Sequence, residues 1–189
     1  MDPSLIEEIN SITDSFVGVH DRIWQVWLAK VVFSWHWRVD VVLAVFPWAL
    51  WLRRRDLQRR LLAGLVTALL ATYLDIIGMT QGWWTYYTWV VPLMPEYLPW
   101  NLAVMPVTAM LFYQYKPNWN PWLKAVLFGD FGAFVSEPLF EWIGIYKRII
   151  WQYWYSLPIY MAIFMLGYAV FIRGHRLRTA AVPKGAAVL

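Results

Sequence analysis

The chain has 189 residues, of which 60% are hydrophobic and 15% charged, and its mean hydropathy is +0.44. An ordinary soluble domain has an apolar share of about 45–50%, so the composition favours a polytopic membrane protein. The absence of cysteine excludes disulfides and thiolate metal sites. The net charge of +4 raises nucleic-acid binding as an alternative, but most basic residues follow apolar segments, where they set membrane topology. We therefore expect no nucleic-acid partner.

The N-terminal segment, residues 1–34, contains an amphipathic helix. Apolar residues from Leu5 to Val26 alternate four and three positions apart, which is the helical period. Ser4 followed by Glu7 has the pattern of a capping box. Asp14 and Asp21 interrupt any apolar run, so this helix is expected to lie on the membrane surface or to pack on the bundle rather than to cross.

The remaining chain predicts an all-α bundle with about five transmembrane helices, over residues 35–178, followed by a flexible tail over residues 179–189. After the second crossing, three prolines (Pro92, Pro95 and Pro99) forbid a continuous helix, so a re-entrant or interfacial hairpin is expected before the chain crosses again. The five crossings are expected at residues 35–52, 61–80, 97–115, 122–145 and 155–172.

The basic residues predict the orientation of the bundle. Eleven of the 16 Lys and Arg residues fall in the loop at 53–60, around residues 116–124, and after the last crossing. With five crossings these three regions share one side of the membrane, and the positive-inside rule places that side in the cytoplasm. The sequence thus predicts an integral protein of a bacterial-type cytoplasmic membrane, with a cytoplasmic C-terminus.

Five carboxylates lie within or beside apolar segments: Asp75, Glu96, Asp130, Glu137 and Glu141. A charged side chain at the centre of a bilayer costs about 3 kcal/mol or more, so such groups usually face a cavity or a partner. At 100° per residue, the three acids of the fourth crossing project from one helix face. We expect Asp75, Glu96, Glu137 and Glu141 to converge on one cavity. The alternative is that they pair with basic residues and only fasten helices together.

Aromatic side chains cluster on the same side as these acids. Aromatic faces attract cations by about 0.5–2 kcal/mol each, so they suit a site that handles positive charge. Interfacial anchoring of the bundle is the alternative role for many of them. The residues expected to bind substrate are Trp83, Trp84, Tyr86, Trp100, Trp142, Tyr146 and Trp154, and Trp151 and Tyr153 belong to the same cluster.

The chain has no Gly-rich phosphate loop, no HExxH motif and no Asp-rich DDxxD motif. The three histidines are scattered, so no metal site of usual spacing is expected. An isoprenoid enzyme without the DDxxD motif, which would hold magnesium on a diphosphate, would have to begin its reaction by protonation, without a metal or another cofactor.

The stretch YLDIIGMTQGWWTY, followed by PLMPEYLPW, resembles the lycopene-cyclase domain pattern of a helix-borne Asp, a Gly, Trp-x-Tyr and Pro-x-Glu-Glu. Asp75, Gly78, Trp84 and Tyr86 match the first part. Glu96 matches the first glutamate of the second part, whereas Tyr97 replaces the second glutamate. The later half is similar to a family of small bacterial polytopic membrane proteins of unassigned function. The whole resembles the integral-membrane terpene cyclases of meroterpenoid pathways.

This resemblance implies a membrane-embedded terpene cyclase that acts on a linear prenyl chain of farnesyl length, either free or linked to a polar head group. Its catalytic acids would be Asp75, Glu96 or Glu137, with Glu141 as a substitute. One acid would protonate an alkene or an epoxide, and the aromatic side chains would stabilise the carbocations. A proton-coupled carrier that uses the same acids, and a non-catalytic membrane scaffold, are the alternatives.

Overall fold

The computed structural model describes residues 2–52, 57–92 and 96–181, and over these residues the chain is mostly helical (79%), with six helices and one short two-stranded ribbon. Three of the helices contain a π-helical stretch, labelled η. The elements in chain order are α1 (Pro3–Val26), η1 (Trp27–Val31), α2 (Trp35–Leu52), α3 (Leu57–Thr80), β1 (Trp84–Tyr86), η2 (Pro99–Val104), α4 (Met105–Gln114), α5 (Pro121–Asp130), η3 (Phe131–Ser136), α6 (Glu137–Trp142), β2 (Tyr146–Arg148) and α7 (Tyr153–Ala181).

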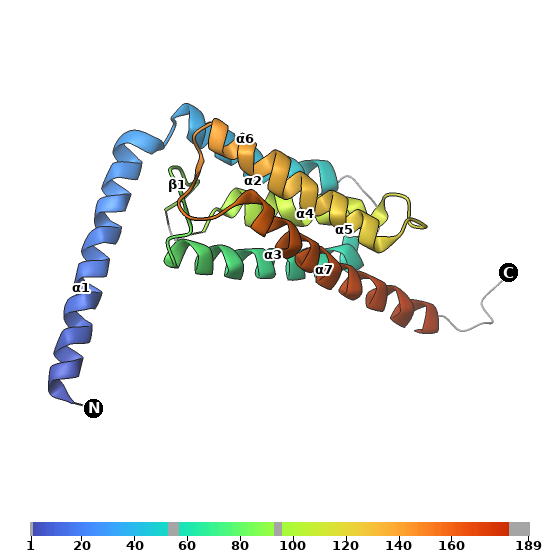
Figure 1. Ribbon diagram of the computed structural model, residues 1–189, viewed down its shortest axis with the longest axis horizontal. Coiled ribbons are helices and arrows are strands. Elements are labelled where there is room, and N and C mark those ends of the chain that lie inside the picture. The colour runs from blue at the N-terminus through green and yellow to red at the C-terminus, as the bar shows by residue number, and fades with distance from the viewer. Residues whose placement is uncertain (1, 53–56, 93–95, 182–189) are drawn as a thin grey trace, which may run out of the picture.

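The five helices after η1 pack side by side as a bundle (Figure 1). Two glycines, Gly129 and Gly132, allow the close approach of α5 and η3 to α7. A Cβ atom on Gly129 would lie 2.9 Å from a methyl carbon of Leu157, and one on Gly132 would lie 2.6 Å from the ring of Tyr160. Larger residues at either position would therefore push α7 away from the rest of the bundle.

Two helical segments, Arg60–Thr80 and Tyr153–Arg173, are long and apolar enough to cross a membrane, with mean hydropathies of 1.9 and 1.8. Much of their apolar surface stays exposed, for example at Leu62, Leu65 and Leu69 on α3. The loop between α4 and α5 and the C-terminal end of α7 lie at the end of the bundle opposite to β1 (Figure 1). The arginines at 53–55 and the tail at 182–189, both used to predict the orientation, lie outside the described residues.

The N-terminal helix forms as the spacing of apolar residues predicts, but its first turn differs from the expected one. Asp2 caps the helix by accepting a hydrogen bond from the amide of Ser4 at 3.1 Å, and Pro3 occupies the first turn. The capping box predicted from Ser4 and Glu7 is therefore wrong. The helix has no buried residue and projects away from the bundle (Figure 1), so packing on the bundle is also excluded as its role.

An antiparallel ribbon corrects the all-α prediction. Strands β1 and β2 pair in a register that places Trp84 opposite Arg148 and Tyr86 opposite Tyr146. The amide of Tyr87 extends this pairing by donating to the carbonyl of Ile145 at 2.9 Å. The ribbon therefore joins the loop after α3 to the loop after α6 at one end of the bundle.

A π-helical stretch also corrects the expected alignment of three acids. The 100° spacing that puts Asp130, Glu137 and Glu141 on one face holds only for a regular α-helix. In the structure η3 lies between Asp130 and Glu137 and changes the angle between them. Glu137 is buried, whereas Asp130 and Glu141 are half-buried, and the three do not share a site.

Candidate functional site

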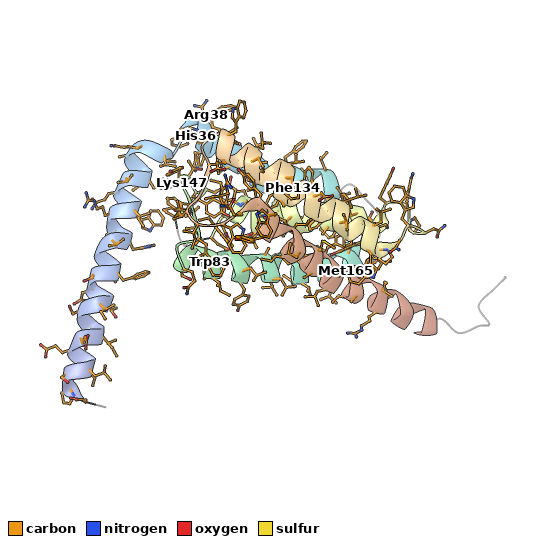
Figure 2. The ribbon with its side chains drawn as sticks, in the orientation of Figure 1. His36, Arg38, Trp83, Phe134, Lys147 and Met165 are labelled. Atoms are coloured by element: carbon orange, nitrogen blue, oxygen red, sulfur yellow. The ribbon has the colours of Figure 1, made fainter. Side chains whose placement is uncertain are left out.

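A cavity of about 80 Å³ lies at the ribbon end of the bundle, between α3, η2, α6 and α7. Side chains crowd this end, as Figure 2 shows around Trp83 and Lys147. Seven residues predicted from the sequence line the cavity: Asp75, Trp83, Trp84, Tyr86, Trp100, Glu137 and Tyr146. Their catalytic and binding roles stay predictions, but the structure does bring two of the four expected acids together.

Asp75 is held by four hydrogen-bond donors, two on each carboxylate oxygen. Its Oδ1 accepts from Trp84 Nε1 at 2.8 Å and from the Tyr86 hydroxyl at 2.9 Å. Its Oδ2 accepts from the amide of Tyr97 at 2.8 Å and from Asn101 Nδ2 at 2.7 Å. An indole N–H and a backbone N–H can only donate. This arrangement therefore suits a carboxylate and leaves no acceptor for the proton of a carboxylic acid.

The donors around Asp75 reach it because of local backbone features. A Cβ atom on Gly78 would lie 2.0 Å from the indole of Trp84, so only glycine at this position lets that ring lie against α3. Strand β1 directs Tyr86 toward Asp75. Burial and the nearby Asp75 carboxylate raise the pKa of the Tyr86 hydroxyl well above its usual value, so this phenol keeps its proton and donates it.

Glu137 has a different environment. It begins α6, only 8% of the residue is exposed, and its Oε1 accepts a hydrogen bond from the Tyr160 hydroxyl at 2.7 Å. Its Oε2 is buried and has no hydrogen-bond partner among the described residues. An ionised carboxylate would leave negative charge on an oxygen without a donor, which is costly in an apolar site. The geometry therefore favours a neutral carboxylic acid here.

A third buried acid, Asp40 on α2, was not singled out from the sequence. It is fully buried, and its Oδ1 accepts a hydrogen bond of 2.5 Å from the Tyr97 hydroxyl. The ring of Tyr97 also stacks on Tyr86, with the ring centroids 4.8 Å apart. Asp40 thus fixes the side chain of Tyr97, the residue whose backbone amide donates a hydrogen bond to Asp75. A lone Asp in the apolar run VDVVLAVF is a signal that could have revealed it.

Four expected site residues lie elsewhere. Glu96 is buried next to Tyr97 but does not line the cavity, and its Oε2 has no partner among the described residues. Glu141 forms an ion pair of 2.9 Å with Arg148 and accepts a hydrogen bond from Tyr153. The prediction that four acids converge on one cavity is therefore wrong for Glu96 and for Glu141. Trp142 and Trp154 are 82% and 61% exposed and lie outside the lining, so neither belongs to the cavity wall.

Eight of the 17 residues that line the cavity are aromatic. Trp83 stacks on Trp151 with ring centroids 5.0 Å apart, and Trp151 meets the edge of Trp84 at the same separation. Elsewhere in the wall, Trp100 packs edge-to-face against Tyr160, with the ring centroids 6.1 Å apart. Neither Tyr160 nor Asn101 was predicted from the sequence, because helix faces in α7 and η2 cannot be assigned without their neighbours.

Within the described part of the chain, no three His, Asp or Glu side chains are placed to hold a metal ion together. Comparison of the chain with protein-family models, with curated proteins and with solved structures finds no match. The class of protein therefore rests on the structure itself: a mostly helical protein with two possible membrane spans and clustered aromatic side chains.

Proposed function

We propose that this protein is an integral-membrane terpene cyclase in which Glu137 starts the reaction by protonating a linear prenyl substrate. The observation that carries the proposal is the buried carboxyl of Glu137, which has one oxygen bonded to Tyr160 and the other unpartnered, in a cavity walled by aromatic rings. A protonated carboxylic acid is the form that a general acid requires. Aromatic faces in a water-poor cavity would stabilise the cation that results.

Two helical segments are long and apolar enough to cross a membrane, and the proposal adds three further crossings to them. Helices α2, η2–α4 and α5–α6 pack alongside α3 and α7, so we propose that all five cross the bilayer. This places the ribbon and the aromatic cavity toward the outer side. The turn between α4 and α5 and the C-terminus then face the cytoplasm, in agreement with the distribution of arginines.

The two cavity acids would have distinct roles. Glu137 would donate its proton to a terminal alkene carbon or to an epoxide oxygen, and new carbon–carbon bonds would then form as the cation moves along the chain. The Asp75 carboxylate, fixed by four donors, would stabilise the cation without becoming protonated. Loss of a proton from the final cation would give the product alkene, and Glu137, ionised by the first step, is the stronger base to accept it.

The cavity volume limits what enters it. About 80 Å³ corresponds to roughly six water molecules by the measure in which each water needs about 10–15 Å³. A complete farnesyl-length chain is larger than this, so we propose that the reacting end of the chain enters first and that aromatic side chains such as Trp83 and Trp151 shift to admit the rest.

The decisive experiment is the incubation of the purified protein, in nanodiscs, with linear prenylated aromatic substrates, followed by mass spectrometry of the products. Glu137→Gln keeps the shape of the side chain but has no carboxylic proton, so turnover should fall ~10²-fold or more. The matched control is Asp130→Asn. Asp130 ends α5, which continues through η3 into α6, but it does not line the cavity, so this variant should keep normal turnover. Full activity of Glu137→Gln would remove the proposed mechanism.

A further inference from the structure

A second cavity, of about 690 Å³, lies at the other end of the bundle, between the end of α4, the following turn and α5. Lys116 and Lys124 line it together with the aromatic side chains of Tyr115 and Trp119. No carboxylate belongs to the described lining. The cavity is therefore positive, and it is separate from the aromatic cavity at the ribbon end.

Lys124 is the unusual member of this lining. Only 2% of the residue is exposed, and its Nζ has no hydrogen-bond partner among the described residues. Among the side chains that the structure describes, the only ion pair joins Arg148 and Glu141, so no acid offsets this ammonium group. A buried ammonium without a partner is strongly destabilising. Among the residues that the structure describes, Lys124 therefore lacks the anion that its burial requires.

Two further cations surround the same cavity. Lys116 has a positive φ of 42°, an uncommon conformation for a residue other than glycine, and its Nζ lies 4.5 Å from the ring centroid of Trp119. Arg60 Nη1 donates to Gln114 Oε1 at 2.6 Å, which brings a guanidinium to the rim formed by Gln114. Lys116 and Arg60 thus add positive charge around the cavity in whose wall Lys124 is buried.

We propose that this cavity binds a phosphate group. Phosphate oxygens would accept hydrogen bonds from Lys116, and from Lys124 Nζ once the buried lysine side chain turns toward the cavity. The apolar side chains of Leu111, Phe112 and Leu127 line the same cavity and offer a surface for a hydrocarbon chain attached to that phosphate. Basic pockets between membrane helices on the cytoplasmic side bind the head groups of anionic lipids, and this cavity lies at the arginine-rich end. The proposal does not depend on the cyclase activity.

The test compares two sources of a phosphate group, a lipid head group and inorganic phosphate. The full-length protein is released from nanodiscs of phosphatidylglycerol or of phosphatidylcholine and examined by native mass spectrometry, and inorganic phosphate is titrated separately while the unfolding temperature is followed. We expect phosphatidylglycerol to stay bound, and Lys124→Met to lower its retention about tenfold. Lys147→Met, which removes an exposed lysine at the other end of the bundle, is the matched control and should retain lipid normally.

The outcomes separate clearly. Retention of phosphatidylglycerol without a response to inorganic phosphate assigns the cavity to a lipid head group, whereas a response to both assigns it to phosphate as such. In detergent without phosphate, Lys124→Met should unfold at the same temperature as the unchanged protein or higher, because it removes a buried charge that has no partner among the described residues. Should Lys124→Met fail to fold, Lys116→Met on the exposed turn gives the same comparison. Equal lipid retention by these variants and by the unchanged protein would overturn the proposal.

Discussion

The environment of Asp75 predicts that Asp75→Asn strongly destabilises the protein. Asparagine keeps the size of the side chain, but its NH₂ group must replace one of the two oxygens that each accept two hydrogen bonds. The Tyr86 hydroxyl and the Asn101 amide can reorient to accept a hydrogen bond. The indole of Trp84 and the backbone amide of Tyr97 cannot, so one fixed donor is left buried without an acceptor whichever way the new amide turns.

The magnitude follows from these contacts. A hydrogen bond to a charged group contributes about 1.5–3 kcal/mol, and the three contacts that survive weaken because the new side chain is neutral. The expected destabilisation is about 3 kcal/mol, a large part of a total stability of roughly 5–15 kcal/mol. For a protein of this length that corresponds to a fall of roughly 6–12 °C in Tm.

Thermal unfolding in detergent, followed by tryptophan fluorescence, measures this fall in Tm. Asp130→Asn is the matched control, because Asp130 is half-exposed and forms no ion pair within the described residues. An Asp75→Asn variant that unfolds at the temperature of the unchanged protein would refute the reasoning, since it would mean that Asp75 is a neutral acid in the folded state. Asp75 would then replace Glu137 as the candidate proton donor.

Three further results are expected. Gly78→Ala should displace the Trp84 indole, because the new Cβ would lie 2.0 Å from that ring, and should lower both Tm and turnover in the assay of the proposed cyclase activity; an unchanged tryptophan emission spectrum would contradict this. Trp100→Ala in the cavity wall should divert products toward partly cyclised or water-quenched compounds in the mass spectrum, whereas Trp142→Ala, at an exposed position, should leave the product pattern unchanged. A reporter fused after Arg178 should read cytoplasmic, and an external signal there would overturn the proposed orientation.

The sequence by itself predicted the helices well, because their signals are local. Apolar runs, prolines and the arginine-rich loop marked five segments after the N-terminal helix, and all five are helical within the described residues. Part of the candidate site could also be predicted, because some of its residues are close together in the sequence. Trp84 and Tyr86 follow Asp75 by nine and eleven residues, close enough for one helix end and one turn to bring them together.

Only the tertiary structure decided which acids share the cavity. Glu137 faces it because η3 alters the helix face, while Glu141 turns to Arg148, and neither outcome follows from a regular 100° spacing. Tyr97, which departs from the pattern that the sequence resembles, lies at the centre of the site because its hydroxyl meets Asp40 and its amide meets Asp75. These contacts join segments more than twenty residues apart. A sequence pattern reports the periodicity of one segment, whereas the packing of several helices sets which faces meet.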